Sequence, residues 1–235
     1  MAQAALSKQQ PLSAAGFRAA TDVSRETLDR LERYAALLEK WNRAINLVAR
    51  GSLADLWRRH MLDSAQLWPL LPPSQGRPRR ILDLGSGAGF PGLVLAIMSA
   101  SEGMNGSGGG VEVHLVEVDN KKAAFLREAA RIAEASVILH VQRIESLAPF
   151  PVDAVTARAC APLPRLLDYA APFLRNYRPG APPPVGLFLK GRDVDRELTK
   201  AREKWHIEAE LLPSHTDAGA KILRLQLPHF GEGQL

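Results

Sequence analysis

The sequence predicts an α/β protein, in which a largely parallel sheet follows a helical N-terminal extension. After Arg80, short apolar runs typical of buried strands alternate with segments of helical periodicity, which implies crossover connections between parallel strands. Before this region, apolar residues recur at helical spacing. A hydrophobic fraction of 46% and a charged fraction of 23% are typical of globular chains and exclude disordered and fibrous classes. We therefore expect a helical extension over residues 1–76 and the sheet domain over residues 77–235.

The extension is predicted to contain two helices after a loosely held arm of about twenty residues, rich in Ala and Gln. The first helix starts at Ser24 and runs to about Leu47, because apolar residues recur there every three or four positions. Ser52 is followed three residues later by Asp55, which is typical of a capping box that opens a second helix. The Pro-rich stretch 69–78 ends that helix.

The sheet domain is predicted from alternating strand and helix patterns. The expected strands are 81–84, 111–116, 137–141, 154–157, 185–189, 207–212 and 222–227, and the expected helices are 91–99, 121–135, 163–174 and 194–204. Residues 101–110 consist largely of Gly and Ser and are expected to form a mobile linker.

Composition also limits the classes of function. No apolar stretch approaches the roughly 18 residues of a membrane span, and the first residues lack the pattern of a signal peptide, so we expect a cytoplasmic protein without a membrane partner. The single cysteine excludes an internal disulfide and a zinc cluster. A net charge of +5, with basic clusters at residues 58–59 and 77–80, favours polyanions without proving nucleic-acid binding.

A glycine-rich loop directly follows one predicted strand and directly precedes a helix. Gly85 and Gly87 allow sharp backbone turns and close approach of a ligand to main-chain N–H groups. The dinucleotide fingerprint requires a small residue at position 90, where this chain has Phe90. The loop therefore favours an adenosyl cofactor over NAD, and a glycine turn without a ligand is the structural alternative.

A carboxylate follows the next predicted strand. Glu117 is expected at the carboxyl end of strand 111–116, where a ligand lies in a doubly wound sheet. There its two oxygens can accept hydrogen bonds from both ribose hydroxyls of a nucleoside. Asp119, two residues later, is a rival for this role, and a surface acid without a role is the structural alternative for Glu117.

Several motifs in the same order resemble those of one family. LDLGSGAGFPGLVLAI, LVEVDNKKAAFLREA, TARACAPL and LKGRD, preceded by WNRAINLVAR and RHMLDS, are similar to the RsmG (GidB) family of ribosomal RNA methyltransferases. The resemblance implies a Rossmann-like class I S-adenosylmethionine-dependent methyltransferase sheet. It also implies methylation of N7 of one guanine in bacterial small-subunit (16S) ribosomal RNA, either free or within the small ribosomal subunit.

Candidate site residues follow from the loop, the carboxylate and the resemblance. The candidates for cofactor binding are Gly85, Gly87, Phe90, Glu117, Ile144, Glu145 and Arg158. The candidates for RNA binding are Arg158, Lys190 and Lys221, which lie near strand ends on the expected active-site edge. For Arg158, an ion pair with Asp153 or Asp83 is the structural alternative.

The sequence lacks the residues that other methyl acceptors require. No Asn/Asp-Pro-Pro-aromatic motif, typical of methylation on exocyclic amines, follows the fourth strand. Cys160 has only alanines beside it, so we interpret it as a small core residue and not as a nucleophile. Guanine N7 carries a lone pair and no proton, so no general base and no catalytic residue is expected.

Other polar and aromatic residues receive structural interpretations. His60 and Asp63 are one helical turn apart without a third ligand nearby, which predicts a local pair on a helix surface and no metal site. The tryptophans of the extension have a spacing typical of core packing. The alternatives to the implied function are a methyltransferase that acts on a small molecule or a protein, and a non-catalytic RNA-binding protein of the same fold.

Overall fold

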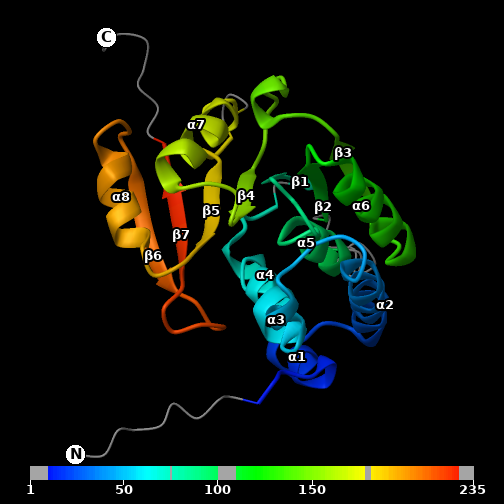
Figure 1. The fold of residues 1–235 in the computed structure, drawn as a ribbon. Helices are drawn as coiled ribbons and strands as arrows, with labels where there is room; N and C mark the ends of the chain where they lie inside the picture. Colours follow the sequence, from blue (N-terminus) through cyan, green and yellow to red (C-terminus); the bar gives the residue numbers. More distant parts are fainter. Residues whose placement is uncertain (1–9, 75, 100–109, 178–180, 228–235) are drawn as a thin grey trace, which may run out of the picture.

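The computed structural model describes residues 10–74, 76–99, 110–177 and 181–227, and within these ranges one seven-stranded sheet carries helices on both faces (Figure 1). The strands are β1 (Arg79–Leu84), β2 (Val111–Val116), β3 (Val137–His140), β4 (Ala154–Arg158), β5 (Val185–Lys190), β6 (Glu208–Pro213) and β7 (Lys221–Gln226). The helices before the sheet are α1 (Ala14–Thr21), α2 (Arg25–Asn42), α3 (Arg50–Leu53), η1 (Trp57–Leu62), α4 (Asp63–Ala65) and η2 (Trp68–Leu70). The remaining helices are α5 (Gly92–Ser99), α6 (Asn120–Ile132), η4 (Ile144–Ser146), α7 (Leu163–Leu174) and α8 (Val194–Arg202).

The sheet has the strand order β3-β2-β1-β4-β5-β7-β6, which confirms the α/β class. The first five strands in this order are parallel, and β7 is antiparallel to both β5 and β6. The chain leaves β1 toward β2 and later returns to β4 on the other side of β1. At such a reversal, the crevice outside the carboxyl ends of the strands is where ligands bind in open α/β sheets.

Two hydrophobic clusters cover the two faces of the sheet. Because side chains alternate along a strand, Ile81 of β1 belongs to one cluster and Leu82 and Leu84 to the other. The first cluster contains residues of α1, α2, α5 and α6, and the second contains residues of α7 and α8. The division of the chain into residues 1–76 and 77–235 stays a prediction, although the first cluster joins residues from both ranges.

The prediction of a loosely held arm is wrong for residues 14–21, which form α1. Phe17 of this helix is fully buried, and its ring centroid lies 5.4 Å from that of Trp57. Ser13 caps the helix by accepting a hydrogen bond from the backbone N–H of Gly16 at 3.0 Å. A single large apolar residue among small ones was too weak a pattern to reveal this helix. The predicted linker 101–110 lies outside the described residues except for Gly110.

Two predicted helix boundaries in the extension also need correction. Ser24 caps α2, but the helix ends at Asn42 and not at about Leu47. The Oδ1 of Asn42 accepts hydrogen bonds from the N–H groups of Leu47 and Val48, both at 2.9 Å. Ser52 does not open a helix as a capping residue. It lies inside α3, and its hydroxyl donates to the carbonyl of Ala49 at 2.6 Å.

Candidate functional site

Three adjoining cavities lie at the carboxyl ends of β1, β2, β4 and β5. The first has a volume of about 550 Å³, the second about 220 Å³ and the third about 440 Å³. The second and third share Gly85, the first and second share Cys160, and the first and third share Arg158. The cavities therefore form one cleft around the glycine-rich loop, at the reversal in strand order.

The glycine-rich loop needs its glycines for conformation and for space. Gly85 and Gly87 have φ values of +67° and +57°, in the region that other residues rarely adopt. A Cβ at Gly85 would lie 2.8 Å from the sulfur of Cys160. At Gly87 the space is open, so the backbone angle alone requires glycine there. Residues 85 and 87 both line the third cavity.

Glu117 holds the loop from β2. It is only 6% exposed, its Oε2 accepts a hydrogen bond from the N–H of Gly87 at 2.9 Å, and its Oε1 accepts one from the N–H of Asp119 at 2.8 Å. Asp119 itself is exposed and caps α6 by accepting from the N–H groups of Lys121 and Lys122. Glu117 lines the second cavity and Asp119 does not, so the geometry favours Glu117 as the ligand of ribose hydroxyls.

Ile144 and Glu145 reach the same cavity from η4. The second cavity thus brings together four of the sequence-based candidates: Gly85, Glu117, Ile144 and Glu145. Glu145 forms an exposed ion pair with Arg143 at 3.2 Å. Tyr169 of α7 also lines the cavity, a residue that the sequence analysis missed because it lies in a helix with no local motif.

Arg158 lies at the end of β4, between the first and third cavities. Its Nη1 donates to the carbonyl of Arg59 at 3.1 Å and lies 3.5 Å from Oδ2 of Asp63. Its guanidinium also lies over the ring of Phe90, 4.7 Å from the ring centroid. Burial lowers the pKa of Arg158 from its usual value, and the negative charge of Asp63 opposes that shift.

The sequence-based alternative for Arg158 named the wrong partners. Asp153 instead accepts two hydrogen bonds of 2.7 Å from Arg77. Asp83 is fully buried and accepts a hydrogen bond from the hydroxyl of Thr156 at 2.8 Å. Burial raises the pKa of Asp83 to about 6.

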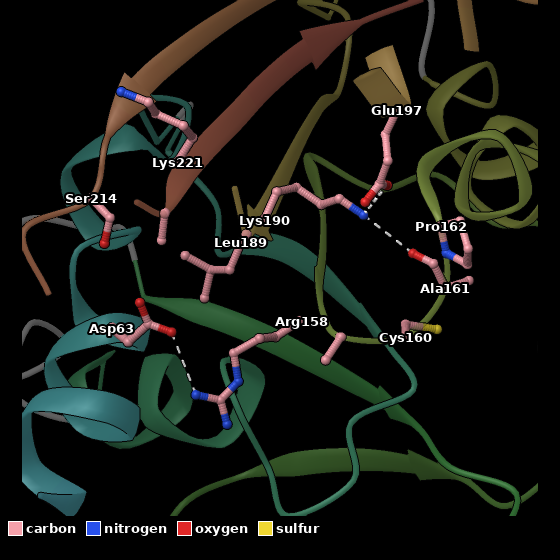
Figure 2. A pocket seen from close by; sticks show the side chains of 13 residues that line it. Asp63, Arg158, Cys160, Ala161, Pro162, Leu189, Lys190, Glu197, Ser214 and Lys221 are labelled. Atoms are coloured by element: carbon pink, nitrogen blue, oxygen red, sulfur yellow. Dashed lines mark hydrogen bonds and ion pairs between the residues drawn. The ribbon is translucent and has the colours of Figure 1, made fainter. Parts of the chain in front are cut away.

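The first cavity brings together the three candidates for RNA binding (Figure 2). Arg158 approaches it from β4, Lys190 from β5 and Lys221 from β7. The side chain of Lys190 is only 9% exposed, and its Nζ lies 2.6 Å from Oε2 of Glu197 and 3.3 Å from the carbonyl oxygen of Ala161. Its role as an RNA ligand stays a prediction, since the ammonium already has two partners within the protein.

Cys160 packs against the second hydrophobic cluster, as its interpretation as a small core residue predicts, and it also lies in the cavity wall. It is half-buried and lines the first and second cavities. Burial, followed by the negative charges of Asp83 and Glu117, raises the pKa of its thiol to about 11. A thiol with this pKa is almost entirely protonated at neutral pH and is a poor nucleophile.

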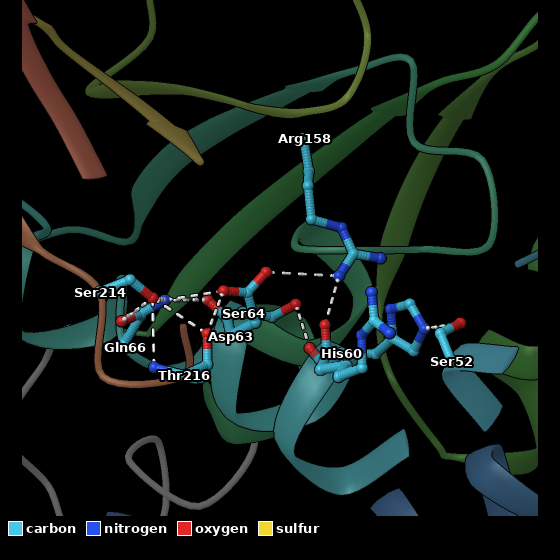
Figure 3. A network of polar contacts seen from close by, with 9 residues as sticks. Ser52, His60, Asp63, Ser64, Gln66, Arg158, Ser214 and Thr216 are labelled. Atoms are coloured by element: carbon cyan, nitrogen blue, oxygen red, sulfur yellow. Dashed lines mark hydrogen bonds and ion pairs between the residues drawn. The ribbon is translucent and has the colours of Figure 1, made fainter. Parts of the chain in front are cut away.

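His60 and Asp63 do not form a surface pair (Figure 3). His60 is 8% exposed, and its Nε2 lies 2.7 Å from the hydroxyl oxygen of Ser52. Asp63 accepts hydrogen bonds from the hydroxyl of Thr216 at 2.8 Å and from Nε2 of Gln66 at 2.9 Å. Burial raises the pKa of Asp63, and the charge of Arg158 opposes this.

These contacts join α4 to the connection between β6 and β7. Gln66 also accepts a hydrogen bond from the N–H of His215 at 2.9 Å, and its Nε2 lies 3.2 Å from the hydroxyl oxygen of Ser214. The partners are about 150 residues apart in the chain, so no local pattern could have revealed them. In the part of the chain that the structure describes, no group of three or more His, Cys, Asp or Glu side chains could hold a metal ion. No helix in the same part is long and apolar enough to cross a membrane.

Comparison with known proteins identifies relatives that match most of the chain. The model of a family described as rRNA small subunit methyltransferase G (GidB) matches residues 27–223. A Rhodospirillum rubrum protein named ribosomal RNA small subunit methyltransferase G is 54% identical over 209 residues, which are 89% of this chain and 94% of the relative. A Parvibaculum lavamentivorans protein with the same name is 48% identical over 227 residues, 96% of this chain and 94% of the relative.

Solved structures share the fold. A Listeria monocytogenes protein assigned to the class I S-adenosylmethionine-dependent methyltransferases matches 87% of this chain and 69% of its own, with a TM-score of 0.57 and 18% identity. A Klebsiella pneumoniae protein assigned as an O-methyltransferase matches 94% of this chain and 99% of its own, with a TM-score of 0.53 and 16% identity. At these identities the likeness is one of fold alone.

Proposed function

Because the chain belongs to the rRNA small subunit methyltransferase G family, we propose that it transfers a methyl group from S-adenosylmethionine to N7 of one guanine in bacterial 16S ribosomal RNA. The fold is that of class I methyltransferases, which supports the cofactor. The specificity for N7, and the choice between free RNA and the small ribosomal subunit as substrate, belong to the proposal.

The observation that carries the proposal is the continuity of the three cavities. Glu117 in the second cavity would accept the ribose hydroxyls, with Ile144 beside the adenine. The third cavity follows the glycine-rich loop and would hold the amino-acid tail of the cofactor. The first cavity, with Arg158, Lys190 and Lys221, would hold the RNA. A cofactor bound in this way would present its methyl group where the cavities meet.

Methyl transfer to guanine N7 does not require a general base in the site. When bound, S-adenosylmethionine supplies an electrophilic methyl group on a sulfonium. Guanine N7 attacks with a lone pair and loses no proton, so the protein has to align the reactants and exclude water. The thiol of Cys160, with a pKa of about 11, is unsuited to the covalent route used for pyrimidine carbons. Alignment of two reactants can contribute up to about 7–11 kcal/mol.

The experiment is single-turnover methyl transfer from labelled S-adenosylmethionine to 16S RNA and, separately, to small ribosomal subunits. The modified base is then mapped through strand scission at N7-methylguanine. We expect one labelled guanine and a rate that changes little between about pH 6 and 9, because no general base titrates. Gly87→Val is the control, since a branched side chain is strained at this φ and should abolish cofactor binding.

Other outcomes distinguish the alternatives. A methyl group on an exocyclic amine or ring carbon, or a rate that rises tenfold per pH unit, would contradict N7 transfer. Transfer to a protein or small molecule with no transfer to RNA would favour a different substrate. Binding of RNA without binding of S-adenosylmethionine would indicate a non-catalytic RNA-binding protein.

A further inference from the structure

Residues 159–162, which connect β4 to α7, form a wall that the three cavities share. All four residues line the first cavity, Cys160 also lines the second, and Ala159 also lines the third. The proposed function assigns the cofactor to the second and third cavities and the RNA to the first. This β4–α7 loop therefore lies where the target base meets the methyl group.

The backbone of the β4–α7 loop is strained and has few hydrogen bonds of its own. Ala159 has a φ of +50°, in the left-handed region that residues other than glycine rarely adopt. Within the described part of the chain, no backbone carbonyl accepts a hydrogen bond from the N–H of Ala159, Cys160 or Ala161. Strained conformations persist only where surrounding groups impose them, so the loop depends on contacts from other elements.

Two side chains from other elements hold the end of the loop next to α7 (Figure 2). Lys190 of β5 donates a hydrogen bond from Nζ to the carbonyl of Ala161 at 3.3 Å, and this Nζ lies 2.6 Å from Oε2 of Glu197. The same Oε2 accepts a hydrogen bond from the N–H of Leu163 at 2.6 Å. The pair thus joins β5 and α8 to the residues on both sides of Pro162.

Glu197 replaces a helix cap that the loop lacks. The N-cap residue of α7 is Pro162, whose side chain has no acceptor for the N–H groups of the first turn. Glu197 supplies the acceptor from α8, and its negative charge suits the N-terminus of a helix. Leu163 is fully buried, so solvent water does not replace this acceptor.

A role of Lys190 as a ligand of RNA phosphate would disrupt this arrangement. The side chain of Lys190 is 9% exposed, and that of Glu197 is 26% exposed. If the ammonium moved to a phosphate, the carboxylate of Glu197 would stay largely buried without its cation, which is costly. The geometry therefore favours a role of Lys190 within the protein.

We propose that Lys190 and Glu197 are positioning residues, which hold the β4–α7 loop in the conformation that aligns the target guanine with the methyl group of the cofactor. This inference rests on the proposed function, because it takes methyl transfer to RNA as given. It assigns the pair to the rate of the reaction and not to the binding of RNA. The rate depends steeply on alignment, and a displacement of about 1 Å can lower it about a hundredfold.

Single-turnover methyl transfer at saturating S-adenosylmethionine and 16S RNA tests the pair. We expect Glu197→Ala and Lys190→Met each to lower the rate about ten- to a hundredfold, while the affinities for S-adenosylhomocysteine and RNA change less than about twofold. Glu197→Gln keeps an acceptor for the N–H of Leu163 and should lose less. Glu203→Ala is the matched control, because Glu203 is exposed at the end of α8 and lines none of the three cavities.

RNA binding separates this inference from a phosphate contact of Lys190. With such a contact, Lys190→Met would weaken RNA binding and reduce the salt slope by about 0.7–0.9, whereas Glu197→Ala would free the ammonium and strengthen RNA binding. These two results together would overturn the proposal. Failure of the wild type to methylate RNA would instead contradict the proposed function.

The strained residue of the loop allows a test by a second substitution. Glycine adopts a φ of +50° without strain, so Ala159→Gly reduces the need for support from outside the loop. We expect it to raise the rate of Glu197→Ala at least about threefold. Ala161→Gly is the control and should not raise it, because Ala161 has no positive φ. Recovery by neither substitution, or equal recovery by both, would overturn the proposal.

A reporter within the loop does not depend on methyl transfer. Cys160 is the only cysteine of the chain, so its alkylation by iodoacetamide follows the opening of the loop. We expect folded Glu197→Gln, checked by circular dichroism, to react at pH 8 about threefold or more faster than wild type, and Glu203→Gln to react like wild type. An unchanged rate in Glu197→Gln and in Glu197→Ala would mean that the pair does not hold the loop and would overturn the proposal.

Discussion

At the scale of single residues, Glu117 and Asp119 show how position decides the role of a carboxylate. Glu117 directly follows β2, is buried, and accepts the N–H of Gly87 from the glycine-rich loop. Asp119 is two residues later, at the start of α6, and satisfies N–H groups of that helix. Both residues are acidic and close in sequence, but only Glu117 faces a cavity.

Substitution of each carboxylate by its amide should separate the two roles. Glu117→Gln removes the charge and leaves one acceptor oxygen, so we expect the affinity for S-adenosylmethionine to fall at least about tenfold. Asp119→Asn is the matched control and should leave the affinity unchanged, because Asn also caps helices well. Calorimetry measures the affinity of both variants for S-adenosylmethionine. Equal losses in the two variants would contradict the assignment of the ribose contact to Glu117.

The raised pKa of Cys160 gives a second prediction for a single residue. Its folded-state value of about 11 means that the thiolate fraction still rises tenfold per pH unit between pH 7 and 9.5. We expect alkylation by iodoacetamide to follow this rise without a plateau, and to be about tenfold or more slower at pH 8 than in the unfolded chain. The readout is mass spectrometry of the labelled protein.

The single cysteine provides its own control for that measurement. Cys160→Ala removes all labelling and should still transfer methyl groups, since the proposed reaction needs no thiol. A plateau in the alkylation rate below about pH 9 would contradict the raised pKa, and loss of methyl transfer in a folded Cys160→Ala protein would contradict the proposed chemistry.

At the scale of elements, the helices before β1 build one wall of the site. The cluster on one face of the sheet includes residues of α1, α2, α5 and α6. Residues Leu47, Val48 and Ala49 line the third cavity because Asn42, at the end of α2, holds the backbone that follows it. The helices thus position the cavity wall in addition to covering the sheet.

The packing of α1 can be tested by stability. Phe17→Ala removes a fully buried ring that contacts Trp57, and we expect the free energy of unfolding to fall by about 3–5 kcal/mol. Ala20→Ser, on the exposed side of the same helix, should change it by less than about 0.5 kcal/mol. Urea titration monitored by circular dichroism measures the free energy of unfolding of both variants. A loss below about 1 kcal/mol for Phe17→Ala would mean that α1 is not part of the cooperative core.

At the scale of the whole molecule, the sheet brings cations that are scattered along the chain to one cavity, together with two acids that pair with them. The net charge is +5, and many of the cations pair with acids within the protein. Arg158, Lys190 and Lys221 come from three strands and meet at one cavity because the carboxyl ends of β4 and β5 lie beside the start of antiparallel β7. Asp63 and Glu197 line the same cavity and pair with Arg158 and Lys190, so among these three cations we expect Lys221 to contact an RNA phosphate.

The salt dependence of RNA binding tests this arrangement. We expect Lys221→Ala to reduce the slope of log affinity against log salt by about 0.7–0.9, the value for one lost phosphate contact. Lys200→Ala is the control, because Lys200 is exposed on α8 and lines none of the three cavities. Filter binding to 16S RNA at several salt concentrations measures the slopes. Equal slopes for wild type and Lys221→Ala would exclude a phosphate contact at Lys221.

The prediction from sequence succeeded where local patterns carry the information. Strand and helix order, the glycine loop and the carboxylate after β2 follow from periodicity and from the spacing of a few residues. It failed at α1, where one buried Phe17 lies among small residues, and at Ser52, where a plausible capping pattern lies inside α3. In both places tertiary contacts outweigh weak local preferences.

The sequence by itself determined the α/β class and the position of the loop at Gly85 and Gly87, because hydrophobic periodicity and backbone requirements are properties of short segments. The family followed from the resemblance of several sequence motifs in the same order. Only the tertiary structure decided which side chains meet. Arg158 pairs with Asp63, Lys190 pairs with Glu197, and the ring of His60 stacks on Phe90. The physical reason is that burial, pKa and hydrogen-bond partners depend on atoms close in space, which the fold brings together from distant parts of the chain.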